Sequence, residues 1–352
     1  MAIKEGVGMP PFITIIMPIR NEEKYIGLAL DSIREQDYPA DSFEVLVVDG
    51  MSDDATRDIV LAKGREFTNL QLLDNPGKIV PCALNIGLQR SRGEVIIRVD
   101  GHVILEPDYV SQCVHYLEQT SAACVGGVIS SINTSWIGQA IAIAMSSKFG
   151  VGNAHFRTRG TEGKEGYVDC LAFGAYRREV FDRIGGFDEE MVRCQDDEFN
   201  YRLRKKGGKI FLSPRIRSYY FTRSSLGHLF RQYFQYGEWK IRVLAKHFSM
   251  MQYRQFIPPL FVISLLTGLL LAPFSQWVRL ILGAELALYI LCALINSILL
   301  CRDNRIQYLP VLPVIFFILH SSYGLGFLYG LVKAFLARLA PPRPVWDNVP
   351  AH

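Results

Sequence analysis

The stretch FITIIMPIRNEE, residues 12–23, shows the fold class most directly. Its first half is an apolar run rich in β-branched residues that ends at Pro18, and this pattern predicts a buried strand. Asn21 is a residue type that caps helix starts, and the two glutamates after it suit the first turn of a helix. Apolar residues then recur at helical spacing over 26–33. The stretch therefore predicts a strand followed directly by an amphipathic helix.

The same alternation continues to about residue 100. Apolar runs at 44–48, 70–73 and 95–99 predict three more strands, and the segments between them predict helices over 54–63 and 80–89. Strands and helices in this order form a mostly parallel sheet with crossover helices, and such sheets bind ligands at the carboxyl ends of their strands. Polar residues that directly follow strand ends are therefore the first candidates for a binding site: Arg20, Asp49 and Asp100.

Composition limits the classes of protein to consider. The chain has 352 residues, 49% hydrophobic and 20% charged, which suits about two domains and excludes wholesale disorder. A formal net charge of +4 is too small to predict nucleic-acid binding. The seven cysteines are odd in number and contain no CxxC pair, which argues against a disulfide framework and a zinc knuckle and favours a reducing compartment.

The C-terminal third has a different character. Residues 256–274, 278–300 and 309–332 are three apolar stretches with almost no charge. Each is close to the ~20 residues that a helix needs to cross about 30 Å of hydrocarbon, so we predict membrane helices. Glu285 lies inside the second stretch, where a carboxyl group is costly unless it finds a partner on a neighbouring helix.

These contrasts divide the chain into five predicted segments: an N-terminal tail over 1–11, an α/β domain over 12–220, an interfacial amphipathic linker over 221–255, transmembrane helices over 256–335 and a C-terminal tail over 336–352. The first tail lacks the apolar core of a signal peptide, so we expect a cytoplasmic α/β domain on a multi-pass protein of the inner cell membrane. The linker is basic and aromatic, which suits contact with anionic lipid headgroups.

The basic residues leave the number of membrane crossings open. Two groups fit the positive-inside rule with three crossings, one before the first apolar stretch and one between the second and the third: Lys240, Arg242, Lys246 and Arg254, then Arg302 and Arg305. A third group follows the last stretch and would then lie outside, against the rule: Lys333, Arg338 and Arg343. Either one stretch does not cross, or the tail is an exception.

The strand ends carry carboxylates rather than a phosphate-binding loop. No Walker loop and no GxGxxG follows the first strand, which disfavours P-loop enzymes and standard dehydrogenases. Asp49 suits hydrogen bonds from a base or a ribose, or it caps the next helix, although Ser52 and Asp53 can also cap. Asp100 and His102 lie two residues apart on one side of an extended segment. Such a pair suits Mn²⁺, whereas Mg²⁺ prefers oxygen alone; the alternative is a turn with a hydrogen-bonded histidine.

A second cluster of chemical interest is the acidic run QDDE at 195–198. Phe199 and Leu203 follow four residues apart, as in an amphipathic helix that ends at Gly207. The acidic run would form the first turn, where the helix dipole favours ionised carboxylates. Asp196 is a candidate general base for a hydroxyl group, and the alternative is ordinary acidic charge at a helix start.

Together these segments resemble the family-2 inverting glycosyltransferases. The resemblance covers about residues 12–250 and rests on an ordered set of motifs: IMPIRNEE at 16–23, VVDGMSDD at 47–54, NPGK at 75–78 with ALN at 83–85, RVDGH at 98–102, FGAYRREVF at 173–181, IGGFD at 184–188 and QD at 195–196. His102 stands where the family usually has a second aspartate, and Gln195 where it has glutamate. The apolar helices resemble the membrane-anchored subgroup that builds bacterial exopolysaccharide, including succinoglycan-type enzymes.

The resemblance implies a GT-A fold and a single displacement with inversion, in which a hexose moves from a UDP-sugar with the help of a divalent metal, Mn²⁺ or Mg²⁺. It also implies roles for the matched residues. Asp196 would be the catalytic base and Asp49 would bind the uracil, while Asp100 would approach the ribose or the metal and His102 would bind the metal. Other matched residues would line the donor nucleotide or the acceptor: Pro18, Arg20, Glu22 and Lys78 on the donor side, and Gly174, Asp197, Arg202 and Trp239 on the acceptor side.

An active site beside a membrane suits a polyprenyl-diphosphate-linked glycan as the acceptor, with other polysaccharide-assembly proteins as possible partners. Two alternatives stay open. Gln235-Tyr-Gly-Glu-Trp239 resembles the Gln-x-x-Arg-Trp motif of processive polysaccharide synthases, with Glu238 in place of the arginine. The other alternative is a catalytically silent membrane scaffold of a polysaccharide assembly complex.

Overall fold

The computed structural model describes residues 9–152, 154–158, 164–222, 224–250, 253–302 and 305–339. The predicted tails therefore lie largely outside the described residues, Arg343 with them. The chain divides into two compact units, Met1–Ser224 and Ser225–His352.

The first unit is built on one sheet of nine strands within the described part of the chain. The strands are ordered β3-β2-β1-β4-β8-β6-β9-β5, with β7 paired to β9. β1 to β4 are mutually parallel, and β8 joins them antiparallel beside β4. The strand bounds are β1 Ile13–Ile19, β2 Phe43–Asp49, β3 Leu70–Asp74, β4 Val95–Arg98, β5 Val103–Leu105, β6 Cys124–Ile132, β7 Gly166–Tyr167, β8 Ala175–Arg177 and β9 Ile210–Phe221. The predicted strand–helix alternation is confirmed.

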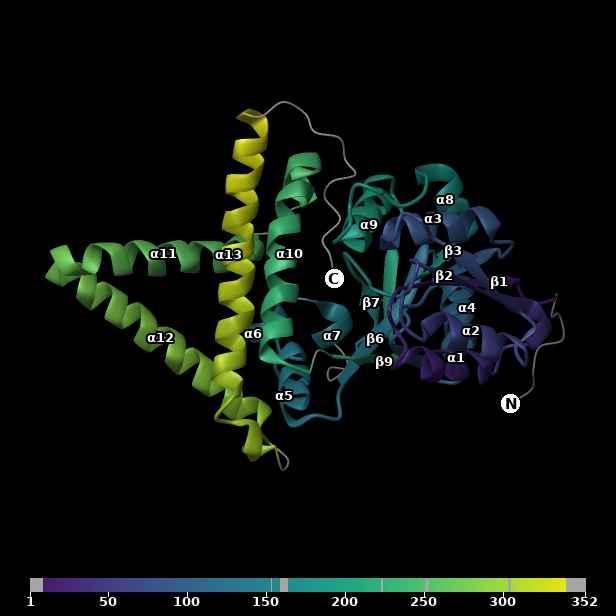
Figure 1. Cartoon of the computed structure of the whole chain (residues 1–352), viewed down its shortest axis with the longest axis horizontal. Helices are drawn as coiled ribbons and strands as arrows, with labels where there is room; N and C mark the ends of the chain where they lie inside the picture. The colour runs from purple at the N-terminus through teal and green to yellow at the C-terminus, as the bar shows by residue number, and fades with distance from the viewer. Residues whose placement is uncertain are drawn as a thin grey trace. The chain divides into compact units, whose positions relative to one another are not determined.

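Helices cover both faces of this sheet (Figure 1). Alternate residues of one strand enter different cores: Ile15 and Met17 pack into the core that includes α1 and α4, and Ile16 packs into the core that includes α3 and α9. This period of two is why the strands are apolar on both sides. The helix bounds in this unit are α1 Ile26–Arg34, α2 Thr56–Gly64, α3 Val80–Arg90, α4 Tyr109–Gln119, α5 Trp136–Met145, α6 Lys148–Val151, α7 His155–Thr158, α8 Arg178–Ile184 and α9 Gln195–Lys205.

The first strand runs further than predicted. β1 continues through Pro18 to Ile19 and stays paired with β2. Proline cannot donate to a ladder, so it is tolerated where one side of the strand has no partner. β4 pairs with β1 only from Ile13 to Ile16, so Pro18 lies beyond that contact.

The predicted helix caps are wrong in both early helices. Asn21 lies in the left-handed region (φ 54°), and α1 begins only at Ile26. The Asn21 side chain instead accepts a hydrogen bond from the Asp53 N–H across to the next loop. Likewise α2 begins at Thr56, whose N–H donates to Asp54 rather than to Ser52 or Asp53. Tertiary contacts between the two loops have replaced local capping.

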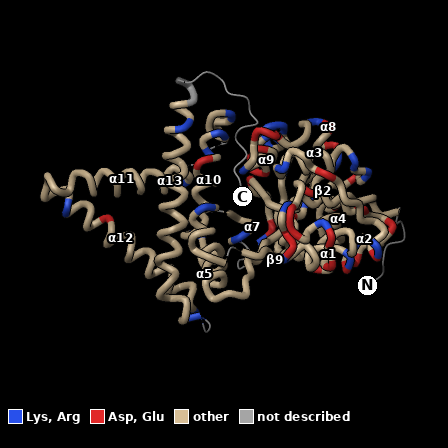
Figure 2. The backbone as a smooth tube through the Cα atoms, in the orientation of Figure 1, with Lys and Arg blue, Asp and Glu red and all other residues tan. Residues whose placement is uncertain are grey.

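The second unit contains α10 Leu226–Lys246, α11 Ile257–Leu271, α12 Gln276–Leu300 and α13 Leu312–Leu339. By length and composition, three of its described helical segments could cross a membrane: Tyr253–Phe274, Gln276–Leu300 and Leu312–Leu336. They match the three predicted apolar stretches. Large apolar side chains of α11 and α12 are widely exposed, and Figure 2 shows few charges on these two helices. Such surfaces are stable against lipid rather than water.

α10 packs closely on α13 through glycines. A Cβ atom at Gly326 would lie 1.9 Å from the Phe234 carbonyl oxygen, and one at Gly237 would lie 2.1 Å from that of Tyr323. Only glycine allows the two backbones to approach this closely. An ion pair joins the same helices, because Lys333 Nζ lies 2.7 Å from Glu238 Oε1.

This ion pair predicts the outcome of a charge exchange. Lys333→Glu places two carboxylates at the contact, so we expect the full-length protein in detergent to melt at a lower temperature. Because the pair is partly exposed, the loss should correspond to about 1 kcal/mol or less. The double variant Glu238→Lys with Lys333→Glu should recover the melting temperature. If the double variant melts no higher than the single variant, the pair does not hold these helices.

Candidate active site

The carboxyl ends of the parallel strands meet at one edge of the sheet, as predicted. Ile19 of β1 is paired with Asp49 of β2, and Asp49 is paired with Asp74 of β3. Arg20 follows directly after β1, and the exposed Lys78 lies in the turn after β3. The structure therefore brings the predicted donor-side residues to a common edge, and it adds Asp74.

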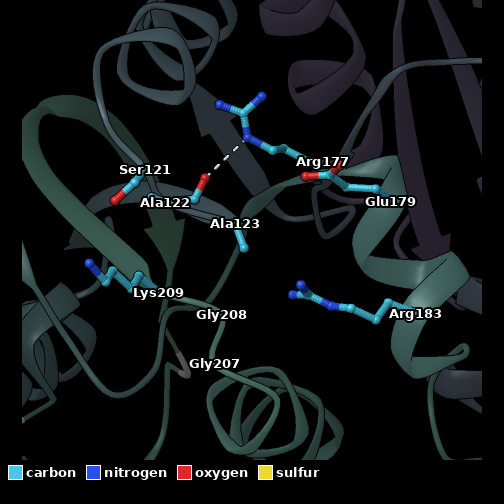
Figure 3. Close-up of a pocket in the computed structure, with 9 residues that line it drawn as sticks. All are labelled: Ser121, Ala122, Ala123, Arg177, Glu179, Arg183, Gly207, Gly208 and Lys209. Atoms are coloured by element: carbon cyan, nitrogen blue, oxygen red, sulfur yellow. Dashed lines mark hydrogen bonds between the residues drawn. The ribbon is translucent and has the colours of Figure 1, made fainter.

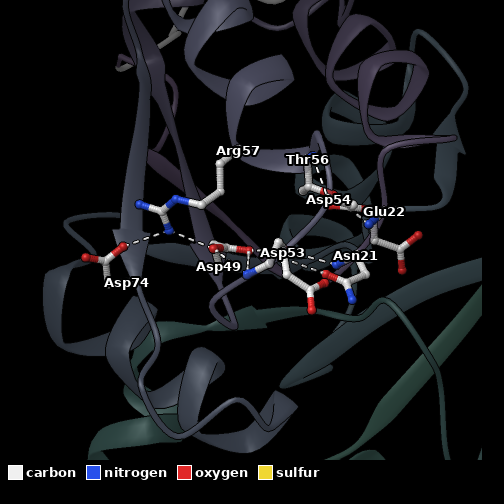
Figure 4. A network of polar contacts seen from close by, with 9 residues as sticks. Asn21, Glu22, Asp49, Asp53, Asp54, Thr56, Arg57 and Asp74 are labelled. Carbon is white, nitrogen blue, oxygen red and sulfur yellow. Dashed lines mark hydrogen bonds and ion pairs between the residues drawn. The ribbon is translucent and has the colours of Figure 1, made fainter. Parts of the chain in front are cut away.

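Asp49 is held by its neighbours. Its side chain has no exposed surface, and its carboxylate lies 2.6 Å from Arg57 Nη1. The Ser52 hydroxyl and N–H also donate to it, while Arg57 reaches on to Asp74 at 2.9 Å (Figure 4). A carboxylate has about four acceptor positions, so three are already taken. Asp49 thus fixes Arg57 and the loop after β2, two connections that sequence spacing did not predict.

The loops after β1 and β2 are tied together. The Glu22 N–H donates to the Thr56 hydroxyl at 2.7 Å, and the Asn21 N–H donates to the Ser52 hydroxyl at 2.9 Å. The carboxylate of Glu23 accepts from the N–H of the residue before α2. Figure 4 shows Asn21, Glu22 and Thr56 beside the Asp49 group. These hydrogen bonds fix the backbone at Glu22, whose carboxylate contacts His102.

Glu22 and His102 form a close pair. Nδ1 of His102 lies 2.7 Å from Oε1 of Glu22, although 80 residues separate them in the chain. Burial lowers the pKa of His102, but neighbouring Tyr220 and the bond to Glu22 outweigh it and raise the pKa to about 9. Because Nδ1 faces the Glu22 carboxylate, Nε2 is the ring nitrogen that would bind a metal ion, which must displace its proton.

Arg98 joins the two predicted catalytic carboxylates. Its guanidinium contacts Asp100 at 2.9 Å and also pairs with Asp196 of α9, and only 8% of the Arg98 side chain is exposed. Burial opposes the Arg98 charge, but Asp100 and Asp196 more than compensate and raise its pKa. From the sequence alone, no role was predicted for this arginine, the first residue of the RVDGH motif. A charged residue at the end of an otherwise apolar strand was the available signal.

Asp196 lies in the first turn of α9, where its side chain is partly buried. Burial raises the pKa of its carboxyl group, while the positive charge of Arg98 works in the opposite direction. The residue before α9, Cys194, lies in the left-handed region (φ 63°) and makes no side-chain cap. The predicted helix is confirmed, with Phe199 and Leu203 fully buried.

The predicted acceptor-side residues do not form one group. The Gly174 carbonyl accepts from the Arg98 N–H, so this glycine positions the strand that carries the arginine. Asp197 accepts from the Cys170 thiol at 3.1 Å. Arg202 is occupied structurally by Glu198 and by the carbonyls of residues 184 and 186. Trp239 belongs to the other unit, where Arg242 lies over its ring at 4.4 Å.

Three polar side chains near this edge have buried atoms without a hydrogen-bond partner among the described residues. They are Nε and Nη1 of Arg20, which follows β1, Oδ1 of Asn75, which follows β3, and Nε of Arg98, the last residue of β4. Buried donors and acceptors are rarely left unsatisfied, so these atoms mark the place of a polar ligand. Two guanidiniums and an amide suit a nucleotide carrying phosphate groups.

The described residues contain no group of three histidine, cysteine or acidic side chains that could hold a metal ion by themselves. Asp100 and His102 supply two ligand types. Mg²⁺ and Mn²⁺ in such sites are commonly completed by substrate phosphates and water. The carboxylate of Glu22 behind His102 is the usual second contact of a metal-binding histidine. The residues present therefore fit a divalent ion shared with a diphosphate.

A polar pocket elsewhere in the unit is separate from this site (Figure 3). It is lined by Arg177, Arg183 and Lys209 among others. Arg177 is level with Val95, the first residue of β4, so the pocket lies at the opposite edge of the sheet. No predicted site residue lines it.

Comparison with known proteins agrees with this geometry. The glycosyl transferase family 2 model matches residues 14–185. A dolichyl N-acetyl-α-D-glucosaminyl phosphate 3-β-D-2,3-diacetamido-2,3-dideoxy-β-D-glucuronosyltransferase of Methanococcus voltae is 30% identical over 92% of this chain and 98% of its own length. The succinoglycan biosynthesis protein ExoA of Rhizobium meliloti is 29% identical over 89% of this chain and 93% of its own.

A solved structure supports the fold. The mannosyltransferase PcManGT of Pyrobaculum calidifontis, in complex with GDP-Man and Mn²⁺, is similar with a TM-score of 0.60 at 17% identity. The match covers 92% of this chain and 88% of that one. The fold is thus the α/β GT-A type, followed by apolar C-terminal helices. With a close relative matched over nearly its whole length, the chain belongs to glycosyltransferase family 2.

Proposed function

We propose that this protein transfers one hexose from a UDP-sugar to a lipid-linked saccharide during the synthesis of a cell-surface polysaccharide or exopolysaccharide. The observation that carries the proposal is the connected group Asp100, Arg98 and Asp196, which lies beside the unpartnered polar atoms of the strand edge. The names of two relatives support the acceptor class, since one acts on a dolichyl-phosphate-linked sugar and the other serves succinoglycan biosynthesis.

The chemistry follows from the placement of Asp196. Its carboxylate removes the proton from an acceptor hydroxyl, whose oxygen forms a bond to the anomeric carbon of the donor. The bond from that carbon to the diphosphate oxygen breaks, and UDP leaves with the electron pair. Attack on the face opposite the leaving group inverts the anomeric carbon. Arg98 holds Asp196 in position and stabilises its ionised form.

Asp100 and His102 would hold the divalent ion, with Glu22 fixing the histidine ring. When bound, the ion supplies positive charge that stabilises the leaving diphosphate. Arg20 binds the phosphates through its two unpartnered nitrogens. Pro18, Lys78 and Asp49 shape the nucleotide pocket, the last through Arg57 and its one remaining acceptor position.

The role of Arg20 predicts a loss of UDP affinity. Arg20→Gln removes charge-assisted hydrogen bonds worth about 1.5–3 kcal/mol, so UDP should bind about 10- to 100-fold more weakly in titration calorimetry. Arg65→Gln, an exposed arginine in the same unit, is the matched control and should leave affinity unchanged. Equal affinity in the Arg20 variant and the wild type would remove Arg20 from the donor site.

The role of His102 predicts a change of metal preference. His102→Asp replaces nitrogen by oxygen, which Mg²⁺ prefers. The ratio of the transfer rate with Mn²⁺ to the rate with Mg²⁺ should therefore fall in this variant. A chelator should abolish transfer in both proteins. An unchanged ratio would mean that His102 does not contact the ion.

We place the protein in the inner cell membrane, with the α/β domain over 12–220 in the cytoplasm and an interfacial segment over 221–255. Single addition is favoured over processive synthesis, because Glu238 replaces the arginine of the synthase motif and pairs with Lys333 of α13. The presence of Asp196, Asp100 and Arg98 in one connected group favours an enzyme over a silent scaffold.

A further inference from the structure

The relation between α10 and α13 bears on how the second unit meets the membrane. The contacts advance along both helices in the same direction: Phe234 meets Gly326, and Ile241 meets Gly330. The helices are therefore parallel, and Figure 1 shows them side by side. The half of α13 that packs on α10 must therefore lie at the same depth in the membrane as α10.

α10 has a charged face that does not suit hydrocarbon. Arg231, Glu238 and Arg242 are spaced by seven and then four residues, so they share one face of the helix. Arg231 and Arg242 are exposed, as is Lys246 one turn further on. Charges at the bilayer centre are costly, whereas water and phosphate at the headgroup level satisfy them. α10 therefore belongs at the membrane surface, and so does the half of α13 that packs on it.

The start of α11 gives independent support. Pro258 at the beginning of α11 would contact a Cβ at Gly324, and Phe256 packs on Phe327 with ring centroids 5.8 Å apart. The chain thus enters α11 beside the middle of α13. Arg254 lies only two residues before Phe256. If α13 crossed the bilayer, this charged connection would lie near the centre. Figure 1 shows α11 leading away from α13 rather than running along it.

α11 and α12 form the part that suits the hydrocarbon. They contact each other through Gly268 and Leu282, and Ser264 donates to Glu285 at 2.7 Å. The bond from Ser264 gives the Glu285 carboxyl group a partner on a neighbouring helix, as predicted for a carboxyl group inside an apolar stretch. α12 has 25 residues, enough for about 37 Å at 1.5 Å per residue.

We infer that only α11 and α12 cross the membrane, as a hairpin, and that α10 and α13 lie together in the headgroup layer on one face. Val314, Phe317, Val332 and Phe335 are exposed on one side of α13 and would face the acyl chains. The partner of this surface is an anionic lipid layer, which attracts the exposed arginines of α10. Both ends of the unit are then on the same face of the membrane.

This arrangement resolves the conflict in the distribution of basic residues. With two crossings, the described basic residues before α11, between α12 and α13 and in the last two turns of α13 all lie on one face, as the positive-inside rule requires. On the opposite face, beside the turn between the crossing helices, Arg279 is the one Lys or Arg among the described residues; it donates to the Ala272 carbonyl. A third crossing along α13 would place Lys333 and Arg338 outside.

Single added cysteines test the proposal in the full-length protein. Arg305→Cys precedes α13 and Arg338→Cys is at its C-terminal end, and Gln276→Cys is at the first residue of α12, beside the turn from α11. A membrane-impermeant maleimide is applied to intact cells and to inside-out vesicles. Wild-type protein in each preparation measures the background from the seven native cysteines.

We expect Gln276→Cys to be labelled in intact cells. The cysteines near the two ends of α13, Arg305→Cys and Arg338→Cys, should be labelled only in inside-out vesicles. Labelling of Arg305→Cys and Arg338→Cys from opposite sides would overturn the proposal, because it requires α13 to cross. Failure of Gln276→Cys to react in intact cells would also overturn it, because the hairpin would not reach the far face. Neither outcome depends on enzymatic activity, so the test is separate from that of the proposed function.

Discussion

Replacing Asp196 by asparagine should reduce kcat for sugar transfer by about 10²- to 10⁴-fold, the usual contribution of a general base. Asparagine keeps the shape of the side chain but cannot accept the proton of the acceptor hydroxyl. The affinity for UDP should stay within about twofold, since the carboxylate acts on the acceptor side. Rates with a saturating donor and titration calorimetry with UDP measure the two quantities separately.

Asp197→Asn is the matched control, because it changes the next residue of the same helical turn. Its carboxylate accepts from the Cys170 thiol, whereas the Asp196 carboxylate pairs with Arg98. We expect less than about a tenfold loss in this variant, well below the loss from removing the base. Full activity in Asp196→Asn would exclude Asp196 as the base, and equal losses in both variants would point to a structural effect of the turn.

Replacing Arg98 by glutamine should have the second largest effect. The variant leaves the carboxylates of Asp100 and Asp196 without their shared buried cation. Breaking a buried pair in this way typically costs about 3–5 kcal/mol, so we expect a clearly lower melting temperature together with lower activity. Arg98→Lys keeps the charge but not the fork that reaches two carboxylates, and should lie between glutamine and the wild type.

The pH dependence separates the electrostatic role of Arg98 from a purely structural one. Asp196 acts as a base only when ionised, so activity falls as the pH drops through its pKa. Burial already raises that pKa, and the charge of Arg98 opposes the rise. Without the arginine the pKa should increase, and the acid limb of kcat should move to higher pH. If the limb does not move in the protein that remains folded, Arg98 does not tune the base.

Local patterns in the sequence predicted most of the fold. Two-residue and 3.6-residue periods gave the strands and helices of the first hundred residues, because buried faces impose them regardless of partners. The start of α9 and the three apolar stretches followed from the same logic. Where Asn21 and Ser52 were expected to cap helices, they bind across two loops instead, and such contacts leave no local signature.

The site was predicted as separate residues and not as a connected group. His102 was expected to bind a metal, but its bond to Glu22 joins positions 80 residues apart. The link from Asp100 through Arg98 to Asp196 spans a similar gap between strand and helix. Spacing along a chain identifies which residue types are present near strand ends. Which of them touch depends on strand order, and one unaligned sequence contains little of that information.

We propose above all that this protein adds a sugar to a lipid-linked saccharide. The most direct test uses membranes that contain the protein, Mn²⁺, a lipid extract from the source organism and a panel of labelled UDP-sugars, and measures label in the organic phase. We expect label from one donor, as a single added sugar, and none with Asp196→Asn. Label that enters only water-soluble saccharides, or a lipid product that forms equally well without the Asp196 carboxylate, would contradict it.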